Sequence, residues 1–554
     1  MSYPAAPAMD APPEKGLAYK WKVLISVIFG IFMIILDSTV INVALQTLRS
    51  EYNITLTEVQ WVISIYVLAL GITTPLSGFL ADRFGIKNVY IGGLALFTLS
   101  SLLCGLAPSF WLLIVARAIQ GIGGGLAQPL GPPMLYRAFP PNEQGRALGF
   151  FGIALVAAPA FGPILGGIMV DADLWRWIFF INVPIGIVGF FLASRFLKKD
   201  PVNEVKPKAD PLGIVTAIVA FGSLLYAATI AGELGWSSSQ VWTWFAIGGV
   251  SLAAFIIIEL FLVKEPLLEL RLFKNPQFAL ATVLGYVTVL ALFGAEFLMP
   301  VYLQALRGRT ALETGLLLLP LAITSGIATP IAGFLYDKIG PRVLLMIGFG
   351  LLVINTWQLS QIQALTPITD IMWLFALRGL ALGFVVQTTF TTALSAVPPQ
   401  QLPRGSSLIN GTRFVVQSIG VAVLATILAS GISQATKDFQ EQATQLGLAS
   451  GPGSSGDAAF GLCETPGVDP ANNVPAAAAN APAAVQGQIK AGINRACQEQ
   501  LVGFERAYNV TFYFALLAFV LGAFLPGWPG KWAGRAGMQA ANKPSEVPPM
   551  TAGH

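Results

Sequence analysis

Few side chains in this sequence could take part in covalent or metal chemistry. The 554 residues include one histidine, His554, and three cysteines, Cys104, Cys463 and Cys497. This inventory excludes a histidine-based catalytic triad, a zinc site of the HExxH kind and a four-cysteine metal cluster within one chain. The sequence therefore predicts no metal and no cofactor, and any proton transfer falls to carboxylates.

Asp37 is the first carboxylate placed to handle a proton. It lies in a long apolar run, fifteen residues beyond Lys22, which is about 22 Å along a helix that rises about 1.5 Å per residue. An ionisable group at that depth of a membrane is costly and tends to face a cavity or a partner. Asp37 is therefore a candidate for loading and releasing protons; a static ion pair or a permanently protonated structural carboxyl is the alternative.

Arg117 could reach the same level from the opposite side of the membrane. It follows Pro108 by nine residues, which places it about 13 Å below that surface and about 17 Å from the other face of a core about 30 Å thick. A guanidinium stays charged whatever its neighbours do, so it could favour deprotonation of a carboxylate and compete with bound cargo. The alternative is a structural arginine bonded to backbone carbonyls.

Glu296 is the most distinctive charge in the second half of the chain. It lies inside an apolar run, four residues before Pro300. We assign it to binding a cationic substrate or a second proton; a position at the outer mouth of that run, with no role in transport, is the alternative. Asn42 and Gln120, which lie in two other apolar runs, complete the expected substrate-binding set.

The elements that carry these residues are apolar enough to cross a membrane. Hydrophobic residues make up 55% of the chain and charged residues 11%, against roughly 25% charged in soluble domains, which excludes a soluble enzyme. A membrane helix needs about 20 mostly apolar residues. Fourteen such runs predict an all-α integral membrane protein, with helices at 22–45, 58–80, 88–107, 110–136, 146–170, 176–196, 211–231, 241–263, 277–304, 313–335, 343–360, 370–396, 405–431 and 507–527.

Lysine and arginine are distributed unevenly over the connections between these runs. The short loops on one side hold only Arg49, Arg176, Arg307 and Arg309, whereas the connections and tails on the other side hold most of the remaining basic residues. Basic residues accumulate on the cytoplasmic side, so both termini are expected in the cytoplasm and the first run is expected to be an uncleaved anchor. The net charge of +4 is too small and dispersed to indicate nucleic-acid binding.

The runs divide the chain into five expected parts. These are a cytoplasmic tail 1–21, an N-terminal six-helix bundle 22–196, a linker 197–276 with two extra helices, a C-terminal six-helix bundle 277–527 and a cytoplasmic tail 528–554. The C-terminal bundle includes an external loop, 432–506, which contains Cys463 and Cys497. In an oxidising exterior a disulfide between them is plausible; two unpaired cysteines are the alternative, because sequence gives no Cα separation.

A repeated segment relates the two halves. Residues 78–87 read GFLADRFGIK and residues 333–342 read GFLYDKIGPR. Parallel repeats are one way in which secondary transporters build a midplane site that can face either side. A carboxylate beside a tight glycine turn can hold a basic residue or helix amides and so latch one conformation; a simple topological anchor is the alternative. The candidate switch residues are Gly78, Asp82, Arg83, Gly85, Asp337 and Gly340.

Four further segments complete the motif set. They read LDSTVINVAL at 36–45, RAIQG at 117–121, GPILGG at 162–167 and WRWIFFINVP at 175–184. Together with 78–87 they resemble the motifs of the major facilitator superfamily and, within it, the 14-span drug:proton antiporters of the EmrB/QacA type. The glycine usual upstream in the antiporter motif is Ala158 here. The antiporter-motif residues are Gly162, Pro163, Gly166 and Gly167, which combine a kink with close helix approach and favour a leak-resistant seam.

The resemblance implies a major facilitator fold with two pseudo-symmetric six-helix halves plus two extra central helices. It also implies a multidrug exporter of the bacterial cytoplasmic (inner) membrane that moves amphipathic or cationic compounds by alternating access, with proton coupling near Arg117. The expected partners are small-molecule substrates, protons and the lipid bilayer; a periplasmic adaptor protein would join them only in a host with an outer membrane. A same-fold exporter of one natural metabolite, siderophore or lipid precursor is the alternative, and a membrane enzyme is disfavoured.

Overall fold

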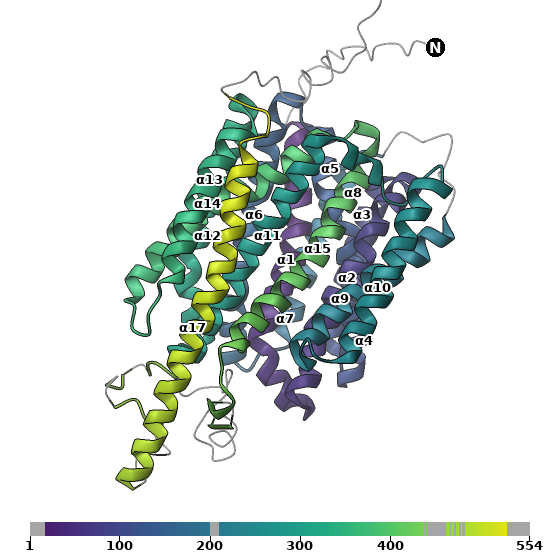
Figure 1. The fold of residues 1–554 in the computed structure, drawn as a ribbon. Coiled ribbons are helices and arrows are strands. Elements are labelled where there is room, and N and C mark those ends of the chain that lie inside the picture. Colours follow the sequence, from purple (N-terminus) through teal and green to yellow (C-terminus); the bar gives the residue numbers. More distant parts are fainter. Residues whose placement is uncertain are drawn as a thin grey trace, which may run out of the picture.

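Long apolar helices make up nearly all of the described protein (Figure 1). The computed structural model describes residues 17–199, 210–436 and 482–528, with short pieces between 438 and 478. No strand occurs in these residues. Thirteen of the described helices are long and apolar enough to cross a membrane. Helix α11, Pro276–Val301, has a described apolar part at Pro276–Ala291, and with it the expected fourteen-helix fold class is confirmed.

The helices follow the expected order along the chain. The N-terminal half contains α1 Tyr19–Tyr52, α2 Leu56–Phe84, α3 Ile86–Leu106, α4 Phe110–Ala127, α5 Gly131–Ala138, α6 Gln144–Asp171, α7 Trp177–Phe180 and α8 Asn182–Phe196. The extra pair is α9 Pro211–Leu234 and α10 Ser239–Ile257. The C-terminal half contains α11, α12 Ala311–Ile339, α13 Pro341–Ser360, α14 Ile368–Ser395, α15 Leu402–Ser430 and α17 Ala483–Gly522.

Helices α2 and α12 show the internal repeat in their local structure. Each begins with a capping box, formed by Thr55 with Glu58 in α2 and by Thr310 with Glu313 in α12. This reciprocal bonding satisfies amide groups that the first turn of a helix leaves without partners. Both helices end at a glycine with positive φ, at Gly85 (φ 88) and Gly340 (φ 77), where a side chain would be strained. The two halves therefore start and stop these helices by the same chemistry.

Two helix pairs join the halves, and the extra helices pack along one of them. Helix α6 packs against α12, and α2 packs against α15. Helix α9 contacts both α2 and α15, with the Leu225 side chain lying against Gly71 of α2. We call the end at which α2 and α12 finish the basic end, and the opposite end the disulfide end. The two halves that the sequence repeat indicates therefore meet at two interfaces, α6 with α12 and α2 with α15.

Two boundaries differ from the sequence-based expectation. The run expected at 110–136 is broken, because prolines at 129, 132 and 133 separate α4 from α5 through the short turn Gln128–Leu130. Helix α17 begins at Ala483 rather than near 507, so the expected external loop 432–506 ends in helix. Its extra turns are polar but rich in Ala and Gln, which are good helix formers, and they extend beyond the bundle (Figure 1).

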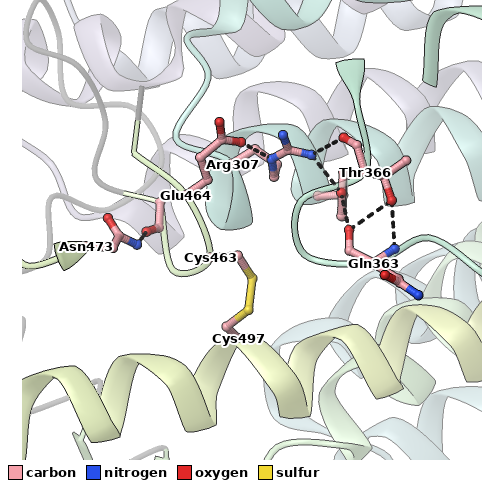
Figure 2. The surroundings of a disulfide bond; sticks show 9 residues. Arg307, Gln363, Thr366, Cys463, Glu464, Asn473 and Cys497 are labelled. Carbon is pink, nitrogen blue, oxygen red and sulfur yellow. Dashed lines mark hydrogen bonds and ion pairs between the residues drawn. A yellow bond between two sulfur atoms is a disulfide. The ribbon is translucent and has the colours of Figure 1, made fainter. Parts of the chain in front are cut away.

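A disulfide fastens this helical extension to the bundle. Cys463 and Cys497 are bonded, with Cα atoms 5.2 Å apart and 34 positions apart in sequence. The Cys463 segment also lies on the disulfide end of the C-terminal half, where the Cys463 amide donates to the Leu306 carbonyl at 2.8 Å. Figure 2 shows Glu464 paired with Arg307 beside the disulfide. The loop segment is therefore held both by α17 and by the helical turn Tyr302–Leu306 that follows α11.

Peptide mapping without reductant should recover Cys463 and Cys497 as one linked peptide pair. A bond closing a loop of this length should stabilise the segment by about 3–4 kcal/mol in a chain-entropy model. Reduction should therefore make residues near Cys463 faster to cleave by protease. Cys104, a buried free cysteine, is the control in the same digest and should be recovered as a free thiol. Two separate unlinked peptides would contradict the disulfide.

Candidate functional site

A buried ion pair joins α1 and α4. Arg117 Nη1 donates to Asp37 Oδ2 at 2.6 Å, and the side chains are 0% and 1% exposed. The depth estimates from the sequence indicated that Arg117 could reach the level of Asp37, and the structure brings the two side chains into contact. Burying two charges is expensive unless the pair is well hydrogen-bonded, so the surrounding groups decide what this pair can do.

Polar side chains from two further positions complete the surroundings of Asp37. Gln120 Nε2 and Asn182 Nδ2 both donate to Asp37 Oδ1, at 2.9 and 2.7 Å. Together with Arg117, three donors therefore converge on one carboxylate from α4 and α8. An added proton on Asp37 would convert an acceptor into a donor, so one of these contacts would have to rearrange. Proton binding at Asp37 would therefore change the hydrogen bonds that hold α1, α4 and α8 together.

Arg117 is held on its other sides by the N-terminal half itself. Its Nε donates to the Val62 carbonyl at 3.0 Å, and its guanidinium carbon lies 4.2 Å from the centre of the Tyr66 ring. Tyr66 in turn donates to the Ile34 carbonyl at 3.2 Å. These contacts from α2 fix the guanidinium plane next to α1. Arg117 would therefore remain in place as a charged neighbour if Asp37 moved.

The ion pair is closed off from both ends in this conformation. Asp37, Arg117 and Gln120 are all buried. Within the described residues, Arg117 Nη2 and Asn182 Oδ1 are buried without a hydrogen-bond partner. Buried polar atoms of this kind are usually satisfied by protein or water, so these two atoms are the positions in the network that can accept a further polar partner such as a water molecule.

The other residues assigned to substrate binding have different positions. Gln120 belongs to the ion-pair network, where its Oε1 accepts from Arg117 Nη1 at 2.9 Å. Asn42 is exposed on α1, and it makes no contact in that network among the interactions described. Glu296 lies in α11, and its side chain is outside the described residues. Of these three residues, the structure places Gln120 in the ion-pair network. The assignment of the three to substrate binding stays a prediction.

Sequence reasoning missed the role of Asn182. It lies at the first position of α8, just after the turn that separates α7 from α8. Its Nδ2 also donates to Ser101 Oγ at 3.1 Å, which ties α8 to α3. The sequence signals are that Asn182 lies in the motif at 175–184 and that its amide stands two residues before Pro184 in a largely apolar run. The sequence does not give the orientation of α8 about its own axis, so it does not show which way the Asn182 amide points.

The repeated segments meet the opposite half in reciprocal contacts at the basic end. Asp82 accepts from Arg404 Nε at 2.5 Å, which ties α2 to the start of α15. Asp337 accepts from the amides of Gly145 and Arg146 at 2.8 and 2.9 Å, which ties α12 to the start of α6. A carboxylate at a helix N-terminus is favoured by the exposed amides there. Each half therefore holds the start of a helix of the other half.

Glycine at the first position of each repeat allows these close approaches. A Cβ added at Gly78 would lie 2.8 Å from the Arg404 Cα, and one at Gly333 would lie 2.3 Å from the Gly145 carbonyl oxygen. Both distances are too short for a real side chain. Gly85 and Gly340 end the helices, and Arg83 lies beyond Asp82 at the same end. The assignment of these residues to a conformational switch stays a prediction.

Arg404 is the second residue that sequence reasoning missed. A weaker repeat would have pointed to it, because residues 140–146 read PPNEQGR and residues 398–404 read PPQQLPR. Each copy begins with a proline pair and ends with arginine at the start of α6 or α15. The structure shows why the signal matters, since the first copy supplies amides to Asp337 and the second supplies a guanidinium to Asp82.

The antiporter motif packs α6 directly on α1. A Cβ at Gly162 would lie 2.2 Å from Thr39 Oγ1, and one at Gly166 would lie 2.8 Å from the Val40 carbonyl oxygen. Gly167 instead faces Leu312 of α12 at 3.5 Å. The side chain of Pro163 lies outside the described residues. The glycines therefore close the seam beside α1 within one turn of Asp37.

Two repeat-related halves of apolar helices, with a buried ion pair inside the N-terminal half, are typical of a multi-pass membrane transporter. The model of the Major Facilitator Superfamily matches residues 27–421. The chain therefore belongs to the Major Facilitator Superfamily, which confirms the resemblance found in its motifs.

Bacterial relatives match across most of the chain. YhcA of Bacillus subtilis, an uncharacterized transporter of this superfamily, is 38% identical over 76% of this chain and 78% of its own. The lincomycin resistance protein LmrB of Bacillus subtilis is 32% identical over 74% of this chain and 85% of its own. A multidrug resistance protein B homolog of Mycobacterium tuberculosis is 32% identical over 71% and 73% of the two chains.

Solved structures show the same fold at low identity. The human organic anion transporter MFSD10 matches with a TM-score of 0.57 and 13% identity, covering 92% of this chain and 100% of its own. The proton:xylose symporter XylE matches with a TM-score of 0.53 and 14% identity, covering 74% and 89%. At these identities the likeness concerns the fold alone.

Proposed function

We propose that the protein is a proton-coupled exporter of amphipathic or cationic drugs. The observation that carries the proposal is the contact between Asp37 and Arg117, with three donors converging on one buried carboxylate. The names of the relatives LmrB and the multidrug resistance protein B homolog support the class of substrate. Small-molecule export against a gradient needs an energy source, and a proton that crosses the membrane supplies about 2.3 kcal/mol per 100 mV.

In the proposed cycle, a proton and the cargo compete for the ion-pair region. With Asp37 ionised, Arg117, Gln120 and Asn182 keep α1, α4 and α8 together. A proton arriving on Asp37 removes the attraction to Arg117 and turns one donor away, which loosens these helices. Protonation of Asp37 can shift the equilibrium between two conformations only by the difference between the free energies of proton binding in those conformations. In the proposed cycle that difference comes from the contacts of Asp37 with Arg117, Gln120 and Asn182, which would be made in one conformation and broken in the other.

The distribution of basic residues supports the orientation in this proposal. The basic end would face the cytoplasm and the disulfide end the exterior, in agreement with the positive-inside bias and with a disulfide that forms in oxidising surroundings. In the conformation described, the basic end is held closed by Asp82 with Arg404 and by Asp337 with the start of α6. The cargo would therefore leave on the side of the disulfide.

Expression in an efflux-deficient bacterial host tests the proposed substrate class. Cells that express the protein should survive higher concentrations of several unrelated cations, such as ethidium, tetraphenylphosphonium and benzalkonium, and a protonophore should remove this protection. Cells with the empty vector are the control. Protection against one compound only would favour an exporter of a single natural metabolite, and unchanged survival on the whole panel would count against drug export.

A further inference from the structure

Two buried carboxyl groups meet at the basic end of the extra helices α9 and α10, outside the ion-pair site. Asp210 directly precedes α9, and Glu259 lies in the π-helical turn Ile258–Leu262 that follows α10. Asp210 is 8% exposed and Glu259 is 1% exposed. Turns of the π type are rare and occur often at functional sites. The position of Glu259 in such a turn therefore calls for an explanation beyond helix packing.

Gly213 leaves room for the two carboxyl groups in the first turn of α9. A Cβ added at Gly213 would lie 2.1 Å from Asp210 Oδ2 and 2.8 Å from Glu259 Oε1. These two oxygens are therefore at most 4.9 Å apart, which is the sum of the two distances. A side chain at position 213 would occupy the space between them. Two acidic groups from different helices thus converge on a position that has no side chain.

Neither carboxyl group has the partners that a buried negative charge needs. In the part of the chain that the structure describes, Asp210 Oδ2 and both side-chain oxygens of Glu259 are buried without a hydrogen-bond partner. The backbone amides of Leu267 and Leu268 approach Glu259, but outside hydrogen-bond geometry. An ionised carboxylate is costly to bury without partners, and such a group usually becomes neutral instead.

Arg404 of α15, a basic residue that approaches Glu259, is already engaged elsewhere. Its Nε donates to Asp82 Oδ2 at 2.5 Å, and its Nη1 donates to the Pro266 carbonyl at 3.0 Å. The connection 263–275 packs against the turn of Glu259 and contains charged residues of both signs, namely Lys264, Glu265, Glu269, Arg271 and Lys274. Among these, Arg271 donates to the Leu260 carbonyl at 3.4 Å. Arg404 is thus shared with a third carboxylate, Asp82.

We propose that Asp210 and Glu259 form a second proton-binding site, at which Glu259 carries the proton and Asp210 stays ionised. Two carboxyl groups that share a site ionise one at a time. The N-terminus of α9 favours a negative charge on Asp210, whereas Glu259 lies at the opposite, C-terminal end of its helix. No third His, Cys, Asp or Glu of the described residues joins the pair to complete a metal site. The site lies on other helices than Asp37 and does not depend on the proposed transport.

Infrared difference spectroscopy on the purified full-length protein tests for this proton. At neutral pH, the spectrum of the unmodified protein minus that of E259Q should contain the carbonyl band of one protonated carboxyl group per protein. The variant D210N keeps Glu259 but replaces its charged neighbour by an amide, which accepts a weaker hydrogen bond than a carboxylate. The band should therefore remain in D210N and move to a higher frequency.

A matched control removes an exposed carboxyl group by the same substitution. Glu505 is exposed on α17, and an exposed carboxyl group is ionised at neutral pH, so E505Q should leave the band unchanged. D210N decides the question if E259Q does not fold. The proposal would be overturned if the difference spectrum with E259Q lacked a carboxyl band, if the band kept its position in D210N, or if E505Q removed it as well.

Discussion

Replacing Asp37 by asparagine should abolish proton-driven transport while leaving the helices assembled. Asparagine keeps the size of the side chain but removes the charge that Arg117 Nη1 contacts at 2.6 Å. A proton then has no carboxylate to bind beside Arg117, so an imposed pH gradient should drive no more uptake of tetraphenylphosphonium into proteoliposomes than occurs in protein-free vesicles. Removing one member of a buried ion pair should also lower the free energy of unfolding by about 3–5 kcal/mol.

A matched substitution distinguishes loss of coupling from general damage. Asp173 is exposed in the turn after α6 with φ 57, a backbone conformation that asparagine tolerates well. Asp173→Asn should transport as the unmodified protein does. Size-exclusion chromatography and thermal unfolding in detergent check that Asp37→Asn remains folded. A folded Asp37→Asn protein with normal gradient-driven uptake would move the proton site to another carboxylate.

Adding one methyl group at Gly333 should hold the basic end open. The new Cβ would lie 2.3 Å from the Gly145 carbonyl oxygen of α6, a contact that backbone atoms cannot relieve without moving apart. Such overpacking costs about 1–3 kcal/mol, which shifts a two-state population by about 5- to 150-fold. Gly333→Ala should therefore depopulate the conformation described here and stop transport. The expected defect is in conformation, with proton binding at Asp37 retained.

Thiol labelling can measure this shift. Ser407 is buried between the halves, where its Oγ lies 2.8 Å from Ser77 Oγ. Ser407→Cys should react slowly with a maleimide in the otherwise unmodified protein, because position 407 is buried. The native cysteines should add little background, since Cys104 is buried and the other two are bonded. Adding Gly333→Ala should speed the reaction at position 407. Gly326→Ala is the control in the same helix, since a Cβ there meets nothing within 4 Å. Equal labelling rates in the two glycine variants would contradict the proposed latch.

The sequence predicted those features that depend on position along a single helix. The depths of Asp37 and Arg117 follow from counting residues into two apolar runs, and the ends of α2 and α12 follow from Gly85 and Gly340. These features need only a fixed rise per residue and the backbone freedom of glycine. The motifs of the Major Facilitator Superfamily also lie at fixed positions along single helices, so the resemblance to the family could be recognised from the sequence.

Features that depend on how helices turn toward one another could not be read from the sequence. Asn182 contacts Asp37 because α8 presents its first residue toward α1, and Asn42 is exposed although it lies on the same helix as Asp37. Apolar runs in a membrane are hydrophobic on every side, so they give little periodic signal for the buried face. The early start of α17 was missed for a related reason, because its polar turns resemble a loop in composition.

Proton release by the purified protein tests the central claim most directly. In weakly buffered detergent solution, tetraphenylphosphonium added to saturation should displace protons from the unmodified protein, and a pH electrode or a soluble indicator dye reads the change. Asp173→Asn should release the same amount, and Asp37→Asn should release none. Undiminished release from a folded Asp37→Asn protein would contradict the exchange of proton for cargo at the ion pair between α1 and α4.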